Sequence, residues 1–193
     1  SLWWRSKRVC LIPAIMILVL GGMTARTASP GNIPENFVDA ETIIPGIVLD
    51  MRYYTAHNFV GERIDGYIQP KCYLTRKAAS ALARVQEEIK PFALSLKIYD
   101  CYRPQRAVDH FVRWARDTGD TRTKDEFYPT IDKRNLFKDR YIAQRSSHSR
   151  GSTVDLTIIP LPPSAQQTYT PGQSLSACYL PVEQRFMDNS IDM

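Results

Sequence analysis

A run of apolar residues at helical spacing between Thr75 and Pro91 is the first constraint on how this chain folds. The apolar positions recur at i, i+3, i+4, i+7 and i+11, and a proline ends the run. This period predicts an amphipathic helix with one buried face. A second helix is expected after Pro104, because proline is tolerated in the first turn of a helix. Its buried stripe continues to Gly119. The apolar residues of the two stripes are Ala78, Ala81, Leu82, Val85 and Ile89, then Ala107, Val108, Phe111, Val112 and Ala115.

Three other segments have the composition of strands. Residues 47–54 alternate polar and apolar side chains with period two, and residues 96–101 (LKIYDC) predict a short strand. Residues 152–159 carry β-branched side chains on both faces, which predicts a strand in the middle of a sheet. Helices and strands alternate too irregularly for a doubly wound sheet. The predicted fold class is therefore α+β, with a mainly antiparallel sheet and flanking helices.

The N-terminus has the layout of a secretory signal. The chain has 193 residues and a net charge of +5, but four basic residues (Arg5, Lys7, Arg8 and Arg26) lie before residue 29 and no acidic one does. An apolar block at residues 9–23, too short to span a membrane comfortably, follows the first three. We expect residues 1–28 to be a signal peptide, with an uncleaved anchor as the alternative. Cleavage would leave a periplasmic protein without a stable membrane span.

The rest of the chain divides into three parts. Residues 29–45 are rich in proline and are expected to be an extended lead-in. A single domain is expected over residues 46–160, with a long surface loop and a short helical piece at 118–140. Residues 161–193, rich in Pro, Gln, Ser and Thr, predict an irregular tail. The body of the chain is nearly neutral and has no basic run, which argues against a nucleic-acid partner.

Three cysteines lie outside the signal, at Cys72, Cys101 and Cys178, so the mature chain can form at most one disulfide. Cys72 and Cys101 both border apolar segments and could pair in an oxidising compartment. Free buried cysteines are the alternative, and the commoner one at this count.

Two polar segments are candidates for chemistry. In the first, His148 is followed seven residues later by Asp155, and imidazole plus carboxylate is a possible pair of zinc ligands. Their side chains converge only if the chain turns between them, and Gly151 is suited to such a turn. In the second, Arg103 follows a predicted strand and can point its guanidinium at a carboxylate or an oxyanion. A structural salt bridge to Asp100 or Asp109 is the alternative.

Together the two segments resemble the D-alanyl-D-alanine dipeptidases of the VanX type, which are zinc peptidases of the wider D,D-carboxypeptidase family. The resemblance covers roughly residues 40–160 and rests on the stretches YDCYRPQRAVDHFVRWA and SSHSRGSTVDLT. The family pattern S-x-H-x-x-G-x-A-x-D implies that His148 and Asp155 are ligands of one Zn²⁺ per chain. Thr153 stands where the family has alanine.

The same resemblance implies the roles of three other residues. Arg103 would be the catalytic arginine, which stabilises negative charge on the substrate carbonyl oxygen. Ser146 and Tyr53 would lie near the substrate, a small D,D-dipeptide. His57 and His110 match no ligand position and are expected to be a loop residue and a structural residue.

In the family, a later E-x-x-H segment provides the third zinc ligand and the general base, and residues 1–193 contain no such segment. We therefore expect an incomplete zinc D,D-peptidase domain that is inactive as written. Glu183 or Asp188 would be the substitutes if a third ligand is present. Two other functions stay open: a catalytically dead module that binds cell-wall or D-amino-acid dipeptides, and a D,D-carboxypeptidase acting on peptidoglycan stem peptides.

Overall fold

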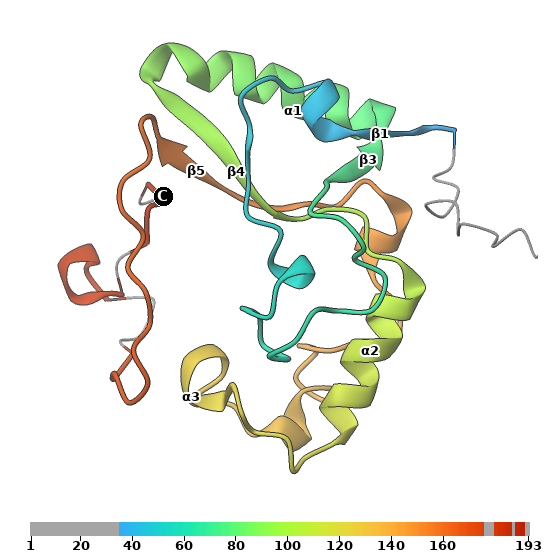
Figure 1. Cartoon of the computed structure of the whole chain (residues 1–193), viewed down its shortest axis with the longest axis vertical. Helices are drawn as coiled ribbons and strands as arrows, with labels where there is room; N and C mark the ends of the chain where they lie inside the picture. The colour runs from blue at the N-terminus through green and yellow to red at the C-terminus, as the bar shows by residue number, and fades with distance from the viewer. Residues whose placement is uncertain (1–34, 176–179, 187, 192–193) are drawn as a thin grey trace, which may run out of the picture. The chain divides into compact units, whose positions relative to one another are not determined.

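Strand β4 (Leu94–Asp100) is the centre of a three-stranded sheet in this computed structural model, which describes residues 35–175, 180–186 and 188–191. It pairs in parallel with β2 (Val48–Leu49) and antiparallel with β5 (Asp155–Pro160). A second sheet joins β1 (Phe37–Asp39) antiparallel to β3 (Tyr73–Thr75). Figure 1 shows helix α1 (Arg76–Ile89) along β4, and α2 (Gln105–Arg116) leading away beyond its end. The α+β prediction is confirmed, with one parallel pair.

Helix α1 begins and ends where the sequence predicted, but its buried face is rotated by about one position. The Thr75 side chain accepts a hydrogen bond from the Ala78 N–H and so caps the first turn. Ala79 and Gln86 are the buried residues, whereas Ala81 and Val85, both in the predicted stripe, are exposed. The predicted stripe is correct at Ala78, Leu82 and Ile89, which pack against the buried cluster, and it omits Gln86 because that residue is polar. The Gln86 side-chain oxygen accepts from the Leu96 N–H at 2.9 Å.

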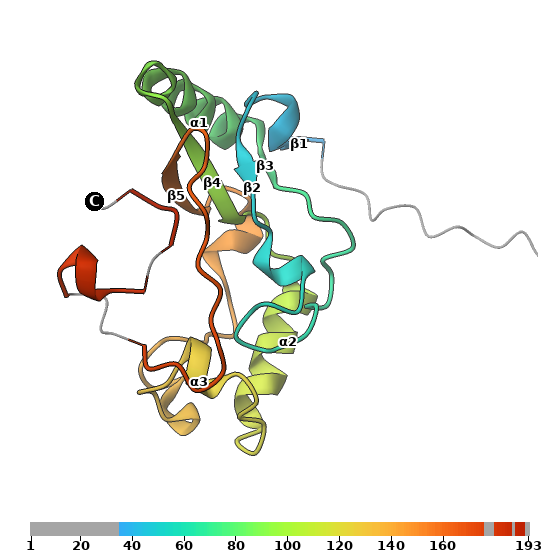
Figure 2. The same cartoon turned by 60° about the vertical axis from the view of Figure 1, so that its left-hand side comes forward.

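Helix α2 packs as predicted and buries Ala107, Val108, His110, Phe111, Val112, Trp114 and Ala115. Pro104 is its N-cap, one position earlier than expected. The predicted long loop follows and contains α3 (Lys124–Phe127) and the 3₁₀ helix η4 (Lys133–Asn135). Figure 2 shows α3 beside the lower end of α2. Tyr128 and Leu136 of this loop are buried in the same apolar cluster as α2, so the loop is part of the core.

The predicted strand at residues 47–54 is wrong beyond Leu49. After the Asp50 N–H donates to the Ile98 carbonyl, Arg52–Tyr54 form the 3₁₀ helix η2. Among the described strands, β2 pairs with β4 alone, and this pairing ends near the end of β4. Met51 is buried without being in a strand. The expected lead-in also contains structure. Residues 37–42 form β1 and the 3₁₀ helix η1 (Ala40–Thr42).

β5 lies at the edge of the sheet and not in its middle, which corrects the prediction for residues 152–159. Its apolar composition is explained by burial of Ile159 and by half-burial of Leu156 and Ile158 against the α1 side. The tail supplies part of the remaining cover. The Ile191 N–H donates to the Ile158 carbonyl at 2.8 Å, and the Asn189 side chain accepts from Lys97 at 3.0 Å. The irregular tail therefore bonds to the sheet at these residues.

Cys72 and Cys101 form a disulfide with a Cα–Cα distance of 5.2 Å, which decides between the two alternatives. Both residues are fully buried in the cluster that joins α1, β3 and β4. The bond ties the start of β3 to the segment that follows β4. Among the described residues, no helix is long and apolar enough to cross a membrane. The predicted signal peptide at residues 1–28 and Cys178 lie outside the described residues.

Candidate functional site

The ends of two adjacent strands place the candidate residues. β4 ends at Asp100 and β5 begins at Asp155, and the two are paired across the sheet next to a register shift. The 3₁₀ helix η5 (Ser147–Arg150) precedes β5 and carries His148. Gly151 turns the chain between them with a φ of 70°, as predicted. A Cβ on Gly151 would lie 2.1 Å from the Phe37 ring, so the turn also allows close packing against β1.

His148 is held from both sides of its imidazole ring. Its Nδ1 lies 2.9 Å from the Cys101 carbonyl oxygen, and its Nε2 lies 3.4 Å from Asp155 Oδ1. A carbonyl oxygen only accepts, so Nδ1 carries the proton that makes this bond. In the neutral ring, the Nε2 lone pair therefore faces the Asp155 carboxylate. Two electron-rich groups that converge in this way are suited to a cation between them.

The electrostatics keep Asp155 ready as a ligand. Its side chain is half exposed. When His148 is protonated, its hydrogen bond to Asp155 lowers the pKa of the Asp155 carboxyl, and the nearby charge of Arg103 lowers it further, although burial raises it. Burial lowers the pKa of His148, but Asp155 and the Cys101 carbonyl raise it, and the net shift is upward. The pair is thus an ionised carboxylate beside a ring whose protonated form it favours.

Arg103 lies next to this pair with its guanidinium fixed. Its Nε and Nη2 donate to Asp100 Oδ2 at 3.0 and 2.7 Å, and Nη1 donates to Ser146 Oγ at 3.4 Å. Its Nη2 also lies 3.6 Å from Asp155 Oδ2. Burial lowers the pKa of Arg103, but Asp100 together with Tyr53 and Tyr67 raises it, and the net shift is upward. Arg103 therefore makes the structural salt bridge to Asp100 and faces the candidate ligands as well.

Tyr53 completes the group by stacking against the arginine. The Arg103 guanidinium carbon lies 5.1 Å from the centre of the Tyr53 ring. Burial raises the pKa of Tyr53 to about 12, although Arg103 lowers it, so the phenol is neutral near pH 7. A cavity of about 320 Å³ opens here. Its lining includes Tyr53, Phe59, Arg103, Phe111, Arg145 and Ser146.

Asp100 and Tyr67 are site residues that the sequence reasoning undervalued. Asp100 is 1% exposed and its second oxygen accepts from the Tyr67 hydroxyl at 2.7 Å. Burial raises the pKa of the Asp100 carboxyl, and Arg103 and Tyr67 oppose the rise. The i,i+3 spacing of Asp100 and Arg103 was visible in the sequence. Nothing local pointed to Tyr67, which lies 33 residues earlier.

Asp100, His148 and Asp155 have ligand atoms within 4.8 Å of one another, and neither Glu183 nor Asp188 belongs to this group. Asp100 lies on the Nδ1 side of the ring at 3.4 Å, and Asp155 lies on the Nε2 side. Asp100 also forms the salt bridge to Arg103, whereas Asp155 faces the Nε2 lone pair of a ring whose proton is on Nδ1. The donor set therefore fits a metal held by His148 and Asp155, with Asp100 serving Arg103.

The two other histidines are bonded elsewhere. His57 Nε2 lies 2.6 Å from Glu126 Oε1, and His110 Nε2 lies 3.0 Å from Glu62 Oε1. The five residues that the sequence analysis selected for the site (Tyr53, Arg103, Ser146, His148 and Asp155) are instead brought together in one place.

A sequence profile of the M15 peptidase family, described as D-ala-D-ala dipeptidase, matches residues 34–161. The chain belongs to this family. Three relatives named D-alanyl-D-alanine dipeptidase support the assignment to M15. Those of Streptomyces coelicolor and Enterococcus faecalis are 42% and 39% identical over 65% and 66% of the chain, and that of Escherichia coli is 32% identical over 63%. The M15 chain spans 62%, 63% and 52% of their respective lengths.

Proposed function

We propose that this site belongs to a zinc-dependent D,D-dipeptidase that hydrolyses D-Ala-D-Ala during the turnover of cell-wall dipeptides. The observation that carries the proposal is the convergence of His148, Asp155 and Arg103 at the ends of β4 and β5. Their types and order are those implied by the resemblance, and the relatives' names give the substrate.

His148 and Asp155 would hold the metal, one Zn²⁺ per chain. The Cys101 carbonyl keeps the proton of His148 on Nδ1 and leaves Nε2 free to bind. When bound, Zn²⁺ supplies Lewis acidity for attack of water on a peptide carbonyl. Catalytic zinc sites use three protein ligands, so we propose that residues 1–193 bind the ion weakly.

Arg103 would stabilise the negative charge that develops on the carbonyl oxygen of the substrate. Its guanidinium is fixed by Asp100 and Ser146 before any substrate binds, so little reorganisation is needed. Asp100 offsets part of its charge, and Arg103 and its partner Ser146 both line the cavity. Tyr53 and the neighbouring aromatic rings would form an apolar wall for the small side chains of the substrate.

The general base is the missing element, since residues 1–193 contain no E-x-x-H segment. We therefore propose that these residues alone have little or no hydrolytic activity. A module that binds dipeptides without cleaving them is the second candidate. It is favoured by one observation, which is that the arginine and cavity are fully formed among the described residues.

The predicted export also belongs to this proposal. The disulfide between Cys72 and Cys101 is of the kind that persists in oxidising compartments such as the bacterial periplasm. It supports a periplasmic location after passage through the predicted signal at residues 1–28.

The proposal is tested by joining residues 34–161 to the C-terminal part of the Streptomyces coelicolor relative and measuring D-Ala-D-Ala hydrolysis with Zn²⁺. The joined protein should be active, and His148→Ala should abolish activity while the matched control His110→Ala keeps it. Binding of D-Ala-D-Ala to the 193-residue chain, with an inactive joined protein, would favour the binding module. Cleavage of a stem pentapeptide in preference to the dipeptide would instead favour a carboxypeptidase.

A further inference from the structure

One peptide unit, between Cys101 and Tyr102, is hydrogen bonded at both of its ends. Its N–H, on Tyr102, donates to the Tyr73 carbonyl at 3.0 Å. Its carbonyl oxygen, on Cys101, accepts from His148 Nδ1 at 2.9 Å. A trans peptide is planar, and its N–H and C=O point in opposite directions. The orientation of the plane therefore determines where the acceptor for His148 lies.

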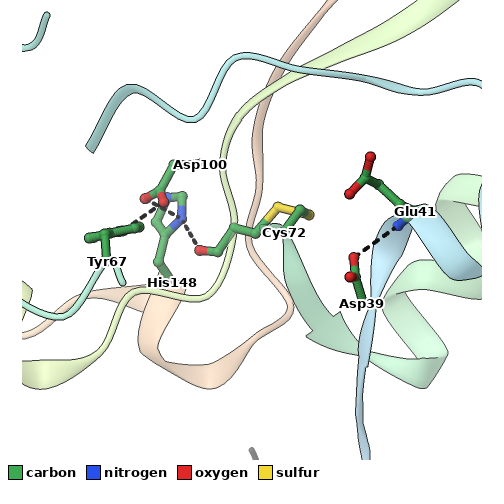
Figure 3. Close-up of a disulfide and its surroundings, with 7 residues drawn as sticks. Asp39, Glu41, Tyr67, Cys72, Asp100 and His148 are labelled. Carbon is green, nitrogen blue, oxygen red and sulfur yellow. Dashed lines mark hydrogen bonds and ion pairs between the residues drawn. A yellow bond between two sulfur atoms is a disulfide. The ribbon is translucent and has the colours of Figure 1, made fainter. Parts of the chain in front are cut away.

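The disulfide fixes this peptide unit to β3. Cys72 directly precedes Tyr73, so the covalent bond and the Tyr102–Tyr73 hydrogen bond join the same two segments at adjacent residues. Figure 3 shows the disulfide at Cys72 near His148 and Asp100. Cys101 follows the end of β4 and so lies beyond the ladder that β4 makes with β5. Both cysteines are fully buried, so the link is enclosed on all sides.

We propose that Cys72 and Cys101 are positioning residues whose disulfide fixes the carbonyl that selects the Nδ1–H form of His148. The inference rests on the proposed function only for its consequence. In the Nδ1–H form, the Nε2 lone pair of His148 is available to bind a metal ion. Without the disulfide, only hydrogen bonds hold the Cys101–Tyr102 peptide in place, and we expect it to rotate away from His148 more often. The ring then populates both neutral forms, with the proton on Nδ1 or on Nε2.

The test is nitrogen NMR of the histidine side chains at alkaline pH, because the spectrum of a neutral imidazole ring reports which nitrogen carries the proton. The chain contains three histidines, so the spectra are simple. His110 is an internal control because its Nδ1 accepts from the Asp65 N–H at 3.2 Å, which requires the proton on Nε2. Wild-type His148 should show the Nδ1–H form. In Cys72→Ala/Cys101→Ala, its signals should move to averaged values while those of His110 stay unchanged.

A merely structural disulfide would not produce this local change. Val60→Ala, a destabilising substitution in the separate cluster around α2, should leave the His148 spectrum as in wild type. An unchanged His148 spectrum in the cysteine variant, or the Nε2–H form in wild type, would overturn the inference. If the cysteine variant does not fold, wild type is reduced with a phosphine in the cold. A change of His148 before His110 supports the inference, and simultaneous collapse of both overturns it.

Zinc titration separates this inference from the proposed function. If both hold, the cysteine variant binds Zn²⁺ about 10-fold or more weakly than wild type, as is typical when a group that orients a ligand is lost. If wild type shows the Nδ1–H form but takes up no Zn²⁺, the inference stands and the proposed metal site fails.

Discussion

Tyr67→Phe removes one hydroxyl group from the buried network behind the site and leaves the ring in place. That hydroxyl donates to Asp100 Oδ1 at 2.7 Å, and Asp100 is 1% exposed, so water does not replace the lost donor easily. A hydrogen bond to a charged group contributes about 1.5 to 3 kcal/mol. For a unit of this size, each kcal/mol corresponds to about 2 to 4 °C in Tm. We therefore expect Tm to fall by about 3 to 12 °C.

The assay is urea and thermal unfolding of wild type, Tyr67→Phe and the matched control Tyr128→Phe. Tyr128 is as buried as Tyr67, but its hydroxyl donates to a neutral carbonyl, that of Asp120, at the longer distance of 3.5 Å. The control should lose at most about 1 kcal/mol of unfolding free energy. Equal losses in the two variants would refute the reasoning that a charged Asp100 depends on Tyr67.

Three further substitutions test other parts of the account. Gly151→Ala should cost about 1 to 3 kcal/mol more in chemical unfolding than Gly46→Ala, because both positions have positive φ but only Gly151 meets the Phe37 ring. Equal losses of unfolding free energy in the two variants would show that the Phe37 ring moves aside without cost. Gln86→Ala should cost about 1 to 3 kcal/mol in the same assay, because it leaves the buried Leu96 N–H without its acceptor. An unchanged unfolding free energy would contradict the importance of the Gln86–Leu96 hydrogen bond. In the joined, active protein, Arg103→Ala should lower kcat about 100-fold or more with little change in KM. A raised KM with unchanged kcat would reassign Arg103 to ground-state binding of a carboxylate.

The helices and the middle strand were predictable because their signals are local. The 3.6-residue period around α1 and α2 and the strand composition of β4 are properties of contiguous sequence. The short β2 and the edge position of β5 depend on which segments become neighbours, and composition does not encode that. Gln86 was missed for the same reason, since its burial is explained by the Leu96 N–H that it meets on another element.

The site residues likewise fall into those with a local sequence signal and those without one. Arg103, His148 and Asp155 lie in two short motifs, and Gly151 indicated the turn that brings two of them together. The groups that orient them come from distant parts of the chain. Tyr67 and the Cys101 carbonyl have no local pattern, because a hydroxyl or a backbone oxygen acquires such a role only through the fold.

The central claim is that His148 and Asp155 hold one Zn²⁺ beside Arg103. The most direct measurement is calorimetric titration of Zn²⁺ into the 193-residue chain, His148→Ala, Asp155→Ala and the control His110→Ala. We expect one weak binding event in wild type and in His110→Ala, lost on dialysis, and none in the other two variants. Binding that survives His148→Ala, or that disappears in His110→Ala, would contradict it. Zinc retained at one equivalent through dialysis would show that a third ligand is present.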